Sequence, residues 1–178
     1  LPKGAGWQVV SGEGGHQAYA ARDTEEDAVL VLLRRRFGYV PYEKLVSGPG
    51  LLNVYQGLCQ IAGIKPDLET PKEITANAPR HAQAEAACRI LARALLGFLG
   101  DACLAFRATG GAVVGGGLGP HIRSFLTEQA SLARFRERGV MSGFMAPIPV
   151  KLIDHPHPAL VGAGALCFDL SRSDRPHD

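Results

Sequence analysis

The segment Ala82–Phe106 constrains the fold of this chain more than any other. Apolar residues occupy almost every side of the helix that it predicts, and such a helix is buried at the centre of its domain. It is interrupted by four charged residues, Glu85, Arg89, Arg93 and Asp101. These charges exclude a membrane span, so we expect a helix-rich lobe built around the segment and no membrane partner.

The composition is that of a globular chain with one substantial core, because 46% of its 178 residues are hydrophobic. The net charge is only +2, and the basic residues are not interleaved with aromatic ones, which excludes a nucleic-acid partner. The four cysteines lack metal-ligand spacing. They predict free thiols in a reducing compartment, the cytoplasm. The only methionines are Met141 and Met145, so we expect further sequence before Leu1.

Local signals predict the elements around the central helix. Acidic residues after Thr24, and Gly38 beyond, predict a helix over residues 24–36 with Thr24 as its N-cap. Pro49, after Ser47 and Gly48, suits the first position of a second helix that Gly63 ends, and residues 70–73 form a capping box. The remaining expected elements are strands at 8–10, 112–114 and 149–153, helices at 122–133 and 159–168, and a loop at 141–145.

Residues 11–16, Ser-Gly-Glu-Gly-Gly-His, are too rich in glycine for a helix or an ordinary strand. Glycine lets a ligand approach the backbone closely. The Glu13 carboxylate can accept hydrogen bonds from hydroxyls, and the His16 imidazole can donate or accept. The loop therefore suits a small molecule with several hydroxyls. The alternative is a glycine-rich turn with a surface Glu and a half-buried His.

Further motifs follow this loop in a fixed order. They are the helix with an acidic start, Glu43, Ser47-Gly48-Pro49-Gly50-Leu51, and Asn53 and Tyr55. Together with the loop they resemble the bacterial glucokinase family of the hexokinase/actin-like ATPase superfamily. The resemblance implies that Glu13, His16 and Glu43 bind glucose. The zinc-site cysteines of the repressor-ORF-kinase family do not follow His16, which favours the glucokinase family.

Residues 110–120 are similar to the family segment that lies beside the adenosine of ATP. This implies nucleotide contacts by Gly116, Gly117 and Leu118, although Gly119 replaces a more usual apolar residue. Asp154, His155 and His157 lie among prolines and predict a turn, with a metal site as the weaker alternative. We expect no metal ligands in the chain.

The resemblance implies an α/β protein of the actin-like ATPase, ribonuclease-H-like fold. The chain would hold its helix-rich α+β large lobe at residues 1–157, without the first strands. A helix at 158–170 packs on the small domain in the family, and residues 171–178 are expected to be a disordered polar tail.

The implied reaction is phosphoryl transfer from ATP, with Mg²⁺, to glucose, giving glucose 6-phosphate in a cytoplasmic homodimer. The family's D-x-G-G-T and T-G-x-G loops, and its N-D-F segment with the general-base Asp, do not occur here. We therefore expect the C-terminal portion of a glucokinase, inactive by itself and without a catalytic residue. The alternative is a non-catalytic sugar-binding or regulatory module.

Overall fold

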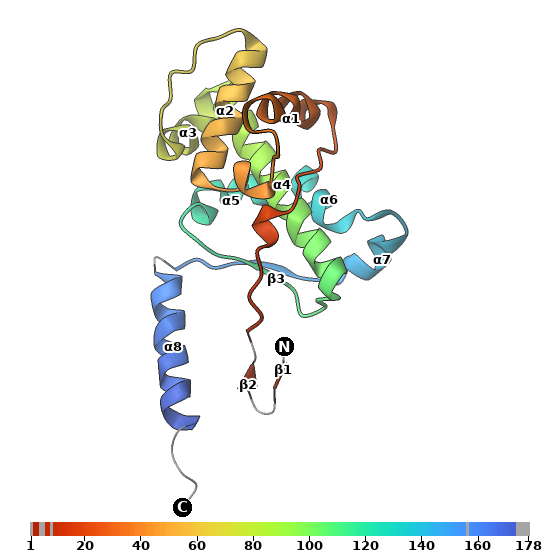
Figure 1. Cartoon of the computed structure of the whole chain (residues 1–178), viewed down its shortest axis with the longest axis vertical. Helices are drawn as coiled ribbons and strands as arrows, with labels where there is room; N and C mark the ends of the chain where they lie inside the picture. Colours follow the sequence, from red (N-terminus) through yellow and green to blue (C-terminus); the bar gives the residue numbers. More distant parts are fainter. Residues whose placement is uncertain (1, 4–5, 8, 156, 174–178) are drawn as a thin grey trace, which may run out of the picture.

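The long helix α4 (Ala82–Phe106) lies at the centre of the computed structural model, which describes residues 2–3, 6–7, 9–155 and 157–173 (Figure 1). This confirms the central helix expected from its apolar sequence. His81 caps its N-terminus, because the Nδ1 atom accepts a hydrogen bond from the Ala84 N–H at 3.4 Å. Buried residues of α4 such as Ile90 and Leu96 belong to the hydrophobic core.

Shorter helices surround α4. They are α1 (Thr24–Phe37), α2 (Gly48–Ala62), α3 (Pro71–Asn77), α5 (Arg123–Leu126), α6 (Gln129–Arg136) and α7 (Ser142–Met145). Helices α2, α3, α5 and α6 pack on α4, while α1 packs on α2 and α7 on α6. The short 3-10 turns are η1 (Gly14–His16), η2 (Tyr42–Lys44), η3 (Ala78–Arg80), η4 (Gly119–Ile122) and η5 (Gly139–Met141).

The helix ends follow the local signals with one exception. Ser47 caps α2, Gly63 ends it in the left-handed conformation, and Thr70 forms the expected capping box of α3. Gly38 ends α1 with a φ of +72°. The prediction of Thr24 as the N-cap of α1 is wrong, because Asp23 precedes the helix and its side chain accepts from the Glu26 N–H at 2.9 Å.

The expected strands at 112–114 and 149–153 form one small parallel sheet. Strand β3 (Ala112–Val114) pairs with β4 (Val150–Leu152), with Ala112 opposite Val150. Near the N-terminus, β1 (Pro2–Lys3) pairs with β2 (Gly6–Trp7) in an antiparallel ribbon. The predicted strand at 8–10 is wrong at Val9 and Val10, which are exposed and in no strand, while Gln8 lies outside the described residues.

Two predictions fail in the C-terminal half. The expected single helix at 122–133 is divided into α5 and α6, because Thr127 Oγ1 bonds the Ser124 carbonyl at 2.9 Å and Glu128 is extended. Residues 141–145 are not a loop. They lie in η5 and α7, and Met145 is fully buried.

Helix α8 (Pro158–Ser173) stands apart from the other helices (Figure 1). It contains the predicted helix at 159–168 and extends to Ser173. Residues 171–173 of the expected polar tail are therefore helical and not disordered, and residues 174–178 lie outside the described residues. Apolar side chains on it are exposed, including Leu160 and Leu166. Every helix in the described part of the chain is too short or too polar to cross a membrane.

The cysteines are free thiols, as predicted, and three of them lie in the core. Cys59, Cys88 and Cys103 are buried, whereas Cys167 on α8 is exposed. Burial raises the pKa of the Cys88 thiol to about 12, so this thiol stays protonated at neutral pH.

Candidate functional site

Two turns far apart in the sequence, η1 and η2, are held next to each other. An antiparallel bridge joins Ala18 to Pro41, and the Tyr42 N–H donates to the Gln17 carbonyl at 3.0 Å. The Tyr39 hydroxyl also donates to the His16 carbonyl at 2.7 Å. These backbone contacts bring the glycine-rich loop beside the segment that contains Glu43.

The three residues predicted to bind a sugar meet at this junction. His16 Nε2 lies 3.8 Å from Glu13 Oε2 and 3.7 Å from Glu43 Oε2. The three side chains are exposed, and neither carboxylate makes a hydrogen bond within the described part of the chain. The arrangement therefore presents two exposed carboxylates and one imidazole to a ligand with several hydroxyls.

A glycine of the loop is required by its contact with the central helix. A Cβ atom on Gly14 would lie 2.8 Å from Cζ of Phe98, which projects from α4. Phe98 also packs on the ring of Tyr42 in η2, with the ring centroids 5.1 Å apart. Both turns of the site therefore rest on the same aromatic side chain.

The Ser-Gly-Pro-Gly segment fixes η2 to the start of α2. Ser47 Oγ accepts from the Gly50 N–H at 2.9 Å and donates to the Glu43 carbonyl at 2.8 Å. Gly50 lies against the preceding turn, because a Cβ atom there would be 2.6 Å from the Leu45 carbonyl carbon. Only glycine allows this approach, which sets the direction of the chain around Glu43.

A chain of polar contacts connects η2 to α4 and Arg138, through an Asp101 side chain that is 48% exposed. The Tyr42 hydroxyl donates to Asp101 Oδ2 at 3.1 Å, and Asp101 Oδ1 pairs with Arg138 Nη1 at 2.9 Å. Burial, followed by the nearby Asp101 carboxylate, raises the pKa of Tyr42 to about 12. Sequence reasoning missed this connection, and its only signal was a carboxylate within an otherwise apolar helix.

The predicted nucleotide residues line a second cleft of about 440 Å³. Gly116, Gly117 and Leu118 line it together with leucines of α4, residues of β3, and Ser47 and Gly48 at the start of α2. Gly116 has a φ of +111°, which favours glycine in this turn. Ser47 and Gly48, at the N-terminus of α2 and shortly after Glu43, therefore border the same cleft.

Gly119, where the sequence departs from the family pattern, is packed against the sheet. A Cβ atom there would lie 2.9 Å from Leu152 Cδ1 of β4. A larger residue at position 119 would require the Leu152 side chain to move.

Residues 154, 155 and 157 lie outside helices and strands. Asp154 pairs with Arg123 at 3.0 Å, and His155 Nδ1 accepts from the His157 N–H at 3.0 Å, while Pro156 lies outside the described residues. Among the residues that the structure describes, no group of three or more His, Cys, Asp or Glu side chains is arranged to hold a metal ion.

Comparisons with known proteins agree on one family. The family model described as Glucokinase matches residues 1–169. A glucokinase of Pectobacterium atrosepticum is 36% identical over 165 residues, which are 89% of this chain and 50% of that protein. A glucokinase of Yersinia pestis (strain Pestoides F) is 35% identical over the same shares. The chain thus spans about half the length of the curated relatives it matches.

Two solved structures resemble the chain. A glucokinase from an Antarctic psychrotroph has a TM-score of 0.81 and 31% identity, covering 91% of this chain and 51% of its own. A glucokinase from Balamuthia mandrillaris, solved in complex with glucose, has a TM-score of 0.70 and 19% identity, covering 83% of this chain and 44% of its own. At 19% identity, the similarity to the Balamuthia mandrillaris structure shows only a shared fold.

Proposed function

Because the chain belongs to the glucokinase family, we propose that it is the sugar-recognising portion of an enzyme that phosphorylates glucose with ATP. The product is glucose 6-phosphate. One observation carries the proposal: Glu13 and His16 of the glycine-rich loop meet Glu43 of a separate turn, with the imidazole between the two carboxylates.

In the proposed role, the three side chains orient the sugar ring. Glu13 and Glu43 accept hydrogen bonds from ring hydroxyls, and His16 binds a further hydroxyl. Each hydrogen bond to a charged group contributes about 1.5–3 kcal/mol. A sugar that lacks or inverts one hydroxyl leaves a carboxylate unpaired, which gives the site its selectivity.

The cleft beside Gly116, Gly117 and Leu118 is the proposed place of the adenosine. Its glycine backbone and leucine wall suit a flat apolar ring, and its volume of about 440 Å³ leaves room for one. Mg²⁺ would arrive with the nucleotide, bound by its phosphates, and neutralise charge during transfer. The residues here hold the nucleotide and the sugar in place.

We assign the general base to an Asp that this chain does not contain, because the family's N-D-F segment is missing from its sequence. The chain alone is then a binding half, inactive by itself. In this proposal residues 1–157 form the large lobe of an actin-like ATPase fold, and the helix at 158–170 contacts the small domain. A homodimer is also proposed, and light scattering on the complete enzyme tests it.

The experiment compares glucose binding and glucose-dependent ADP production. Calorimetry measures glucose binding to this chain, and a coupled assay measures turnover of a fusion that supplies the missing half from the Pectobacterium glucokinase. Glu13→Gln is expected to weaken glucose binding at least tenfold and to leave the unfolding temperature unchanged, since its side chain is 89% exposed.

Glu69→Gln provides the control, because it makes the same chemical change at an exposed residue beside α3. Unchanged glucose affinity in Glu13→Gln would remove this residue from the site. Glucose binding without turnover in the fusion would favour a sugar-binding or regulatory module over the kinase.

A further inference from the structure

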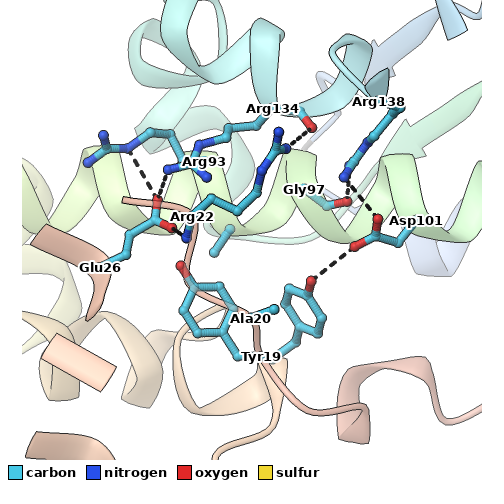
Figure 2. Close-up of a pocket in the computed structure, with 11 residues that line it drawn as sticks. Tyr19, Ala20, Arg22, Glu26, Arg93, Gly97, Asp101, Arg134 and Arg138 are labelled. Atoms are coloured by element: carbon cyan, nitrogen blue, oxygen red, sulfur yellow. Dashed lines mark hydrogen bonds and ion pairs between the residues drawn. The ribbon is translucent and has the colours of Figure 1, made fainter. Parts of the chain in front are cut away.

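A partly open pocket of about 170 Å³ lies between α4, the start of α1 and the α6–α7 region, and Tyr19 and Tyr42 also line it (Figure 2). We call it the arginine pocket. Its charged lining residues are Arg22, Glu26, Arg93, Asp101, Arg134 and Arg138. The pocket does not include Glu13, His16 or Glu43, so it is separate from the proposed sugar site.

Positive charge exceeds negative charge in this lining, with four guanidinium groups against two carboxylates. Three of these groups are shielded from solvent: the side chains of Arg138 and Arg134 are 10% and 11% exposed, and that of Glu26 is 2% exposed, whereas Arg22 and Asp101 are exposed. Charge–charge interactions are strong in such a setting, because water screens them poorly.

The carboxylates in and around the pocket are already engaged. Glu26 pairs with Arg134 and lies 3.7 Å from Arg93 Nε, and Asp101 pairs with Arg138. Outside the lining, Asp23 pairs with Arg93 and Arg134, and Glu25 pairs with Arg93. These pairs hold the guanidinium groups in place without satisfying all of their hydrogen-bond donors.

Several donors remain available. Arg22 pairs with no carboxylate in the described part of the chain, and its guanidinium donates to the carbonyls of Arg134 and Glu137. Arg93 Nε and the Tyr19 hydroxyl are buried beside the Glu26 carboxylate, and neither makes a hydrogen bond of good geometry. Buried donors without a partner are costly, so a ligand or ordered water that accepts from them is favoured.

The pKa shifts of the pocket arginines run in both directions: burial lowers the pKa of Arg93, but Glu25, Asp23 and Glu26 raise it overall, whereas the pKa of Arg138 is lowered. Burial lowers the pKa of Arg138, and repulsion from Arg22 and Arg134 lowers it further, against the opposing effect of Asp101. Burial and then the Glu26 carboxylate raise the pKa of Tyr19, so its hydroxyl keeps its proton and remains a donor at neutral pH. An added negative charge would relieve the repulsion among the guanidinium groups.

We propose that the arginine pocket binds one small oxyanion of the phosphate class, held by Arg22 at its mouth and by Tyr19 and Arg93 inside. Guanidinium groups match the geometry of phosphate oxygens. The volume of the pocket suits a single phosphate group and is too small for a nucleotide. The anion comes either from inorganic phosphate or from the phosphoryl group of a small metabolite.

The test measures the unfolding temperature of this chain against inorganic phosphate at constant ionic strength, with calorimetry for the affinity. Phosphate is expected to raise the unfolding temperature saturably, because a ligand that binds only the folded state stabilises it. Arg22→Gln should weaken phosphate binding roughly tenfold or more, and Tyr19→Phe, which removes only the hydroxyl, roughly threefold to tenfold.

The matched control is Arg35→Gln, which removes the same charge from an exposed position of α1 away from the pocket. It should bind phosphate as the unmodified chain does. Glycerol 3-phosphate distinguishes the two sources of the anion. If it raises the unfolding temperature at least as much as inorganic phosphate does, the site is assigned to a phosphate ester. If it raises the unfolding temperature less, the site is assigned to free phosphate.

Three outcomes would overturn the proposal. One is no saturable response to either probe. Another is equal loss in Arg22→Gln and Arg35→Gln, which would mean general charge screening. The third is unchanged binding in both Arg22→Gln and Tyr19→Phe, which would place the anion elsewhere, such as at the start of α2. None of these outcomes depends on glucose binding, so the proposed function is tested separately.

Discussion

Two glycines of helix α2 are expected to respond in opposite directions to the same substitution. Gly50 and Gly57 lie on this one helix and both are buried. A Cβ atom on Gly50 would lie 2.6 Å from the carbonyl carbon and 2.7 Å from the carbonyl oxygen of Leu45. On Gly57 it would meet Val29 Cγ1 at 3.7 Å and Leu32 Cδ1 at 4.0 Å, which are ordinary contacts.

The magnitudes follow from these distances. Alanine is favoured over glycine in a helix by about 0.5–1 kcal/mol. Gly57→Ala should gain this amount in the free energy of unfolding, since the new methyl group fits. Overpacking costs about 1–3 kcal/mol, and the upper end applies at Gly50 because the clash is with backbone and cannot be relieved by a rotamer change. Gly50→Ala should therefore lose about 2 kcal/mol.

Urea denaturation of the two variants and the unmodified chain measures both changes. The slopes of the free energy against urea should agree, so that the midpoints report stability alone. A neutral or stabilising Gly50→Ala would refute the close approach of α2 to the η2 turn. That result would also refute the positioning of Glu43 by Ser47 and Gly50.

Three further predictions concern other parts of the chain. Gly14→Ala should push η1 away from Phe98 and weaken glucose binding severalfold in calorimetry, and Gly15→Ala, where a Cβ atom meets nothing within 4 Å, is the control. Hydrogen bonds from Tyr55 and then His81 lower the pKa of Asp67 in the folded chain. The Asp67 carboxylate therefore stabilises the fold at pH values above its unfolded pKa of about 3.9. This stabilisation is lost as the pH falls through the lower pKa of the folded state. Asp67→Asn should therefore be less stable at neutral pH and show a shallower loss of stability below about pH 4 in thermal unfolding, and an unchanged acid slope would contradict this. A thiol reagent should label only Cys167 in the folded chain and all four cysteines in urea, whereas rapid labelling of Cys88 would show that α4 is not buried as described.

Elements set by local chemistry could be predicted from the sequence. Ser47, Gly63 and Thr70 mark helix ends through contacts with residues only a few positions away, and those contacts depend little on the rest of the fold. The division of α5 from α6 could not be predicted, because the periodicity of residues 122–133 is continuous and the break depends on how Thr127 and Glu128 are placed.

The candidate site shows the same contrast. The family resemblance of the motifs predicts Glu13, His16 and Glu43 as sugar-binding residues. The structure brings the three side chains together, and their roles remain predictions. The support below them was not accessible, because Tyr42 and Asp101 are 59 residues apart and nothing in either local sequence indicates the other. Contacts of that kind are fixed by tertiary packing alone.

The contact of both η1 and η2 with Phe98 has a consequence for the kinetics of ligand binding. Phe98 belongs to the most deeply packed helix, so the turns that carry Glu13 and Glu43 are already ordered before a ligand arrives. A preorganised site loses little conformational entropy on binding. In the proposed role of Glu13, His16 and Glu43, the rate of sugar binding should then be limited by encounter and desolvation.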